Sequence, residues 1–86
     1  MYIIMAYDVN EKRVAKVLKI ARKYLTWIQN SLLEGEITES KFERLKAELS
    51  KIIDESEDSV VFYKFGSEKL FQKEFMGEKL GPKLFM

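Results

Sequence analysis

The chain has 86 residues, of which 47% are hydrophobic and 34% charged, and its formal net charge is +1. This composition excludes a disordered chain and predicts one small globular domain, near the lower size limit for a stable isolated core. The chain contains neither cysteine nor histidine, which excludes disulfides, thiolate zinc sites and histidine-based catalysis. Any catalysis must therefore use carboxylates, hydroxyls, lysines or a bound metal ion.

An apolar run at residues 2–7 predicts a buried β-strand, because it is rich in side chains that favour strands. The run is too short to span a membrane, and it lacks the basic flank and cleavage site of a signal peptide. We therefore expect a cytoplasmic protein with no membrane partner.

A helix is predicted next, with Asn10 as its N-cap and Glu11 in its first turn. Its apolar stripe consists of Val14, Val17, Leu18, Ala21 and Leu25. Opposite this stripe, four lysines lie within roughly 30° of one line: Lys12, Lys16, Lys19 and Lys23. Glu11 is the only acid in the helix, so this face carries charge of one sign. It is either an ordinary solvated face or a surface that binds nucleic-acid phosphates.

The segment TWIQNSLLEGEI predicts two short strands, residues 26–29 and 32–37, joined by a tight turn at Asn30 and Ser31. One longer bent strand is the alternative. Thr38 is the expected N-cap of a second helix, whose buried stripe consists of Phe42, Leu45, Leu49, Ile52 and Ile53. The outer face of this helix mixes both signs of charge, which is typical of a solvated surface.

The segment DSVVFYKF predicts the last strand. Large apolar residues continue after Gly66, namely Leu70, Phe71, Phe75, Met76, Leu80, Leu84, Phe85 and Met86. A disordered tail seldom carries so many, and they need a surface to cover. We therefore expect a domain at residues 1–65 and an extension at residues 66–86 that contributes to a dimer interface.

The element order strand, helix, strand, strand, helix, strand predicts an α+β fold of the ferredoxin-like βαββαβ type. This fold has one antiparallel sheet with both helices on one face. The other face is left for a ligand, a second subunit or nucleic acid, and the fold alone does not choose among them.

Three segments also carry a family resemblance: YDVNEKRVAKV, WIQNSLLEGEIT and DESEDSVVFYKF, followed by a tail with Gly-Pro. In this order and spacing they resemble the CRISPR-associated protein 2 family over residues 2–82. The resemblance implies a symmetric homodimer in which the chain end adds a strand to the partner's sheet. It also implies a magnesium-dependent endonuclease acting on RNA or DNA, and a scaffold between two dimers of the CRISPR integrase during spacer acquisition.

The resemblance further implies site residues. The family's acid at the end of the first strand matches Asp8, and the aromatic before it matches Tyr7. The hydroxyl of the hairpin motif matches Ser31, and the basic position early in the first helix matches Arg13. One departure is Leu33, which stands where the family often has an aromatic residue, so base stacking is not expected there.

These residue types suit phosphodiester cleavage. Mg²⁺ takes oxygen ligands, commonly one or two carboxylates together with substrate phosphate, so two Asp8 side chains facing each other across a dimer axis could hold one ion. Such an ion lowers the pKa of a bound water without histidine. Tyr7 and Ser31 could orient water or phosphate, and Arg13 could offset developing charge. The ordinary alternatives are a cap or loop residue for Asp8, a core residue for Tyr7, a turn residue for Ser31 and a surface residue for Arg13.

Three functions stay open at this point. The first is a metal-dependent nuclease at the Asp8 pair, acting on duplex DNA or single-stranded RNA. The second is a non-catalytic scaffold, whose nucleic-acid-binding face would comprise Lys12, Arg13, Lys16, Lys19 and Lys23. The third is a related toxin-like ribonuclease outside any CRISPR locus.

Overall fold

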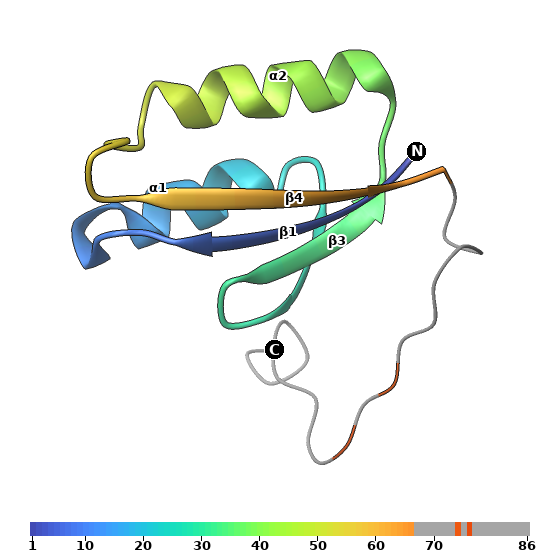
Figure 1. Cartoon of the computed structure of the whole chain (residues 1–86), viewed down its shortest axis with the longest axis horizontal. Helices are drawn as coiled ribbons and strands as arrows, with labels where there is room; N and C mark the ends of the chain where they lie inside the picture. The colour runs from blue at the N-terminus through green and yellow to red at the C-terminus, as the bar shows by residue number, and fades with distance from the viewer. Residues whose placement is uncertain (67–73, 75, 77–86) are drawn as a thin grey trace.

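The computed structural model describes residues 1–66, 74 and 76, and it has six elements in the predicted order. These are β1 (Tyr2–Asp8), α1 (Glu11–Ala21), β2 (Thr26–Gln29), β3 (Leu32–Glu36), α2 (Glu39–Ser50) and β4 (Ser59–Phe65). Both helices lie on the same side of one sheet (Figure 1), so the ferredoxin-like α+β prediction is confirmed. The predicted extension lies outside the described residues except at Gly66, Glu74 and Met76, and the division after residue 65 stays a prediction.

The sheet has the strand order β2-β3-β1-β4, and all neighbouring strands are antiparallel. β1 is central, pairing with β3 on one edge and β4 on the other. Its apolar sequence suits a strand with neighbours on both edges. At its end, Asp8 lies opposite Ser59 of β4.

The hydrophobic core lies between the sheet and the two helices. Alternate residues of β1, namely Ile3, Met5 and Tyr7, belong to it, because successive side chains of a strand point to opposite faces. The helices contribute Val17, Ala21, Phe42, Leu45 and Leu49. Phe42 packs edge to face on Phe62 of β4, with ring centroids 5.0 Å apart. Asp8 therefore points to the face of the sheet opposite the helices.

Both helices begin at the predicted N-caps. The side chain of Asn10 accepts a hydrogen bond from the backbone amide of Lys12 at 2.9 Å, and that of Thr38 accepts one from Lys41 at 3.2 Å. Since Asn10 caps α1, the alternative in which Asp8 caps this helix is wrong.

Three strand boundaries differ by one residue from the prediction. β4 begins at Ser59 instead of Asp58, since the buried Asp58 side chain pairs with Arg13. β1 continues to Asp8 because this residue pairs with Ser59. β3 ends at Glu36 instead of residue 37, since Ile37 is buried and its amide donates to the carbonyl of Met1 at 2.9 Å. The alternative of one bent strand is also wrong, because β2 and β3 pair with each other.

Candidate functional site

Asp8 is exposed at the last position of β1. Within the described residues its side chain has no hydrogen bond or ion pair to another group. No cluster of three or more acidic, histidine or cysteine residues suited to a metal occurs in that part of the chain. The described residues of one chain therefore hold too few carboxylates for a closed metal site.

Tyr7 lies on the opposite face from Asp8, in the core, with only 7% of its surface exposed. Its hydroxyl donates to the carbonyl oxygen of Asn30 over 3.5 Å. Burial raises the pKa of the Tyr7 phenol above its ordinary value. At neutral pH the group is therefore a hydrogen-bond donor and not a base.

The turn between β2 and β3 is held against the end of β1. The indole Nε1 of Trp27 donates to the same Asn30 carbonyl at 2.8 Å, and the Tyr7 amide donates to the carbonyl of Ser31 at 3.1 Å. Asn30 has a φ of 40°, in the left-handed region that asparagine tolerates better than most residues. The structure thus brings Asp8 and Ser31 to one end of the sheet.

Arg13 is engaged in an ion pair. Its Nε donates to Oδ2 of Asp58 at 2.5 Å, and its Nη2 donates to Oδ1 at 3.0 Å. The same Nη2 donates to Glu57 at 3.2 Å. The Asp58 side chain is 0% exposed and that of Arg13 is 20% exposed. This bidentate geometry is the strong form of such a pair.

Asp58 is the residue at this end of the sheet that the sequence analysis missed. Its carboxylate also accepts hydrogen bonds from the backbone amides of Asn10 and Asp54, each at 2.8 Å. It therefore joins the start of α1 to the loop before β4, and the next residue, Ser59, pairs with Asp8. The sequence shows an acid before the last strand, but nothing in one sequence indicates its partner.

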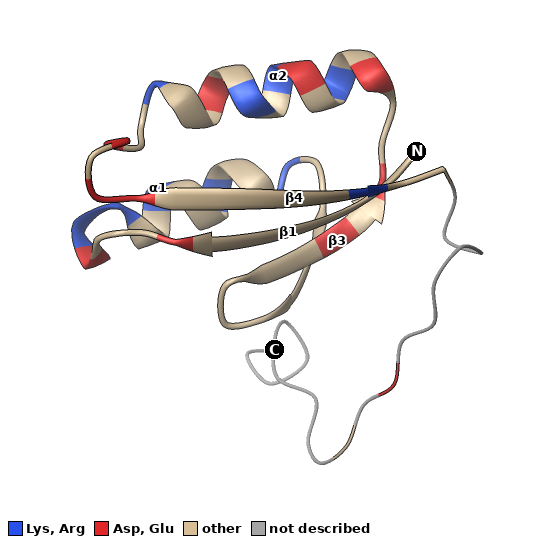
Figure 2. Cartoon of the chain, in the orientation of Figure 1, with Lys and Arg blue, Asp and Glu red and all other residues tan. Residues whose placement is uncertain are grey.

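The four lysines of the predicted binding face fall into two groups, because α1 ends at Ala21, before Lys23. Lys12, Lys16 and Lys19 are exposed and have no ion-pair partner in the described part of the chain. Lys23 is paired with Glu48 of α2. Figure 2 shows both signs of charge following each other along α2, as expected for a solvated face. The first three lysines therefore form the unpaired cationic part of the predicted binding face.

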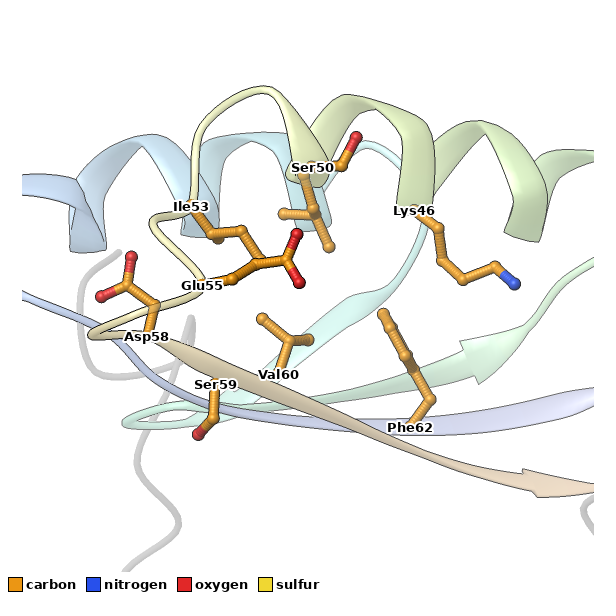
Figure 3. A pocket seen from close by; sticks show the side chains of 9 residues that line it. Lys46, Ser50, Ile53, Glu55, Asp58, Ser59, Val60 and Phe62 are labelled. Carbon is orange, nitrogen blue, oxygen red and sulfur yellow. The ribbon is translucent and has the colours of Figure 1, made fainter.

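A pocket of about 390 Å³ lies between α2 and β4 (Figure 3). Its apolar lining consists of Leu49, Ile53, Val60 and Phe62, and its polar lining of Lys46, Ser50, Glu55, Asp58 and Ser59. Val60 and Phe62 are on the helix side of the sheet, so the pocket is separate from Asp8. None of the predicted site residues lines it.

Neither helix in the described ranges has the length and apolar content that a membrane span requires.

The family model for CRISPR associated protein Cas2 matches residues 1–73. The CRISPR-associated endoribonuclease Cas2 of Thermotoga maritima is 60% identical over 86 residues, which cover 100% of this chain and 99% of the relative. The relative of the same name in Methanocaldococcus jannaschii is 46% identical over 82 residues, covering 95% of this chain and 72% of the relative.

A crystal structure of Streptococcus pyogenes Cas2 has the same fold, with a TM-score of 0.80 and 35% sequence identity. The match covers 90% of this chain and 100% of that chain. The similarity therefore extends over both the sequence and the arrangement of its elements.

The ion pair predicts how stability depends on acid. Hydrogen bonds from Arg13, together with those from the amides of Asp54 and Asn10, hold the pKa of Asp58 far below its ordinary value of 3.8. As pH falls, Asp58 binds a proton in the unfolded chain before it does so in the folded chain. The stability that the ionised Asp58 contributes is therefore complete above about pH 4 and is lost as pH falls toward the folded-state pKa.

Thermal unfolding between about pH 2 and pH 7 checks this expectation. The wild-type protein should lose Tm in acid more steeply than Asp58→Asn, which has no carboxyl to protonate at this position. Parallel curves for the two proteins would contradict it.

Proposed function

Because the chain belongs to the CRISPR-associated protein Cas2 family, we propose that it is a magnesium-dependent endonuclease of CRISPR adaptation, acting at Asp8 in the cytoplasm. The resemblance found in its sequence motifs is thereby confirmed at the level of the family. The observation that carries the proposal is the position of Asp8, an exposed and unpaired carboxylate at the end of a central strand. Relatives are named endoribonucleases, which favours RNA over DNA as substrate.

A homodimer completes the site in this proposal. The described part of one chain offers Asp8 as a single unpaired carboxylate at this end of the sheet, whereas two copies meeting there would supply two carboxylates, the oxygen donors that Mg²⁺ takes in proteins. When bound there, Mg²⁺ would lower the pKa of a coordinated water and offset the charge of the phosphate. The donor chemistry of Asp8 fits such an ion, since no cation of the described residues neutralises it.

The neighbouring residues have supporting roles. The Ser31 hydroxyl, at the adjacent turn, provides a hydrogen-bond donor for a phosphate oxygen. Tyr7 acts through this turn, because its protonated hydroxyl contacts Asn30 on the core side of the sheet. A direct action of Tyr7 on the substrate would need its side chain to leave the core.

A second candidate function is a non-catalytic scaffold for nucleic acid and the CRISPR integrase. The observation that favours it is the set of exposed, unpaired lysines on α1, Lys12, Lys16 and Lys19. Such a row can neutralise successive phosphates of a duplex without reading its sequence. The two functions are compatible, since the lysines and Asp8 lie on different elements. Membership of the Cas2 family favours both over a toxin-like ribonuclease outside a CRISPR locus.

Asp8→Asn tests the nuclease proposal. Asparagine keeps the size of the side chain and removes its charge, so folding should be unchanged while magnesium-dependent cleavage falls by at least about 100-fold, the scale for losing one electrostatic catalytic group. Cleavage of labelled single-stranded RNA and duplex DNA, with and without Mg²⁺, measures this. Glu11→Gln, a neutralised exposed acid in the adjacent helix, is the matched control and should cleave as the wild type does.

Wild-type rates in the Asp8→Asn protein would show that this carboxylate holds no essential metal. If neither protein cleaves but both bind duplex DNA, the scaffold function is the correct one.

The scaffold function predicts a change in salt dependence. The affinity for duplex DNA falls with salt, and the slope of log affinity against log salt counts phosphate contacts. Replacing Lys12, Lys16 and Lys19 by glutamine should reduce the magnitude of this slope by up to about 2.7, or about 0.9 for each lost contact. Adding Lys23→Gln should contribute less, because Glu48 already pairs with this lysine. Fluorescence anisotropy over a salt series measures the slope.

Lys41→Gln in α2, combined with Lys51→Gln at the C-cap of this helix, is the control, and it should leave the slope unchanged. An unaltered slope in the α1 variant would show that these lysines form an ordinary solvated surface and do not bind phosphates.

The homodimer is tested by truncation. If residues 67–86 contribute to the dimer interface by packing on the partner subunit, a chain that ends at Gly66 should be monomeric or should aggregate through uncovered apolar surface. Size-exclusion chromatography with light scattering gives the oligomeric state. A soluble dimer with unchanged thermal stability would show that the extension has no part in the interface.

A further inference from the structure

Four hydrogen bonds converge on one buried carboxylate beside Asp8. The Asp58 side chain is 0% exposed, and it accepts two bonds from Arg13 and one each from the amides of Asn10 and Asp54. A carboxylate so enclosed resists movement, because removing any partner leaves a buried charge incompletely compensated.

This carboxylate fixes the chain on both sides of Asp8. After Asp8, only Val9 separates it from Asn10, whose amide donates to Asp58 and whose carbonyl accepts from the amide of Arg13 at 2.8 Å. Across the sheet, Asp8 pairs with Ser59, the residue that follows Asp58. Asp58 thus holds the segment that carries Asp8 in two ways. Its side chain binds the amide of Asn10, and its backbone continues into Ser59, which pairs with Asp8.

Arg13 binds this carboxylate with two of the three nitrogens of its guanidinium group. Its Nε and Nη2 bind the two Asp58 oxygens, and Nη2 also contacts Glu57. A guanidinium used in this way keeps a fixed orientation. Turning Nε and Nη2 toward a substrate phosphate would leave Asp58 unpaired inside the protein, which is strongly unfavourable.

We propose that Arg13 and Asp58 form a positioning pair that holds the Asp8 carboxylate in place, and that Arg13 acts through Asp58 and not on the substrate. This inference rests on the proposed nuclease function. It replaces the role in offsetting developing charge that the chemistry of the residue suggested for Arg13, and it adds Asp58 as a residue required for the reaction.

A double-mutant cycle separates this role from direct action. Arg13→Gln and Asp58→Asn should each lower kcat for RNA cleavage by about 10- to 100-fold, since small displacements of a catalytic group have effects of this size. KM should stay within about twofold, and the double variant should be no worse than either single variant, because both remove the same pair. If Arg13 instead contacted the phosphate directly, Asp58→Asn would leave it free to do so and kcat would be retained.

Arg13→Lys is a second variant, for the case in which Asp58→Asn does not fold, and it leaves both charges of the pair in place. Lysine keeps the positive charge but cannot make the bidentate contact, so the positioning role predicts that kcat still falls. Retention of wild-type kcat in Arg13→Lys or in folded Asp58→Asn would overturn the inference.

Glu48→Gln is the matched structural control. It removes the ion pair of α2 with Lys23, which follows the C-terminal end of α1, away from Asp8. It should lower thermal stability without lowering kcat. An equal loss of kcat in this control would show that general destabilisation, and not positioning, explains the effects.

Amide hydrogen exchange at Asn10 provides a readout that does not need activity. Exchange should be faster in Arg13→Lys and Asp58→Asn than in Glu48→Gln, because only the first two disturb the contact of this amide with Asp58. Lack of cleavage by the wild-type protein would contradict the proposed function alone. In that case faster exchange in these two variants supports the positioning pair, and unchanged exchange overturns it.

Discussion

The alternation of side chains along β1 determines what each residue at its end can do. Tyr7 belongs to the core, so Asp8 must point to the opposite face. The register of β1 is fixed by pairing on both edges, and a slip of one residue would bury the acid and expose the core side chains. The exposure of Asp8 is therefore a consequence of how Ile3, Met5 and Tyr7 pack.

Most of the fold could be predicted from the sequence because its local patterns agree with one another. The caps Asn10 and Thr38 stand immediately before amphipathic segments, and apolar runs mark the strands. The ends of strands are harder to predict from local pattern. Ile37 lies outside β3 because it packs in the core and its amide donates a hydrogen bond to the carbonyl of Met1. The separation of Tyr7 from Asp8 also follows from strand periodicity, although the family resemblance grouped the two as site residues.

Contacts between distant segments account for what the sequence could not show. The helical periodicity placed four lysines on one face of a helix, but α1 ends at Ala21, before Lys23. The pattern of one segment also cannot indicate that Glu48 of α2 pairs with this lysine. In the same way, Arg13 and Asp58 are 45 residues apart, and each resembles an ordinary surface residue by type. Their pairing depends on β4 lying next to β1, which is a property of the sheet order.

That sheet order has a consequence for synthesis on the ribosome. β1 lies between β3 and β4, and of these two neighbours β4 is translated last, so one edge of β1 has no partner while the intervening residues are made. Contacts between such distant segments form late, because loop closure must precede them. A nascent chain that pauses before β4 therefore exposes an unpaired strand edge, which favours association with other chains.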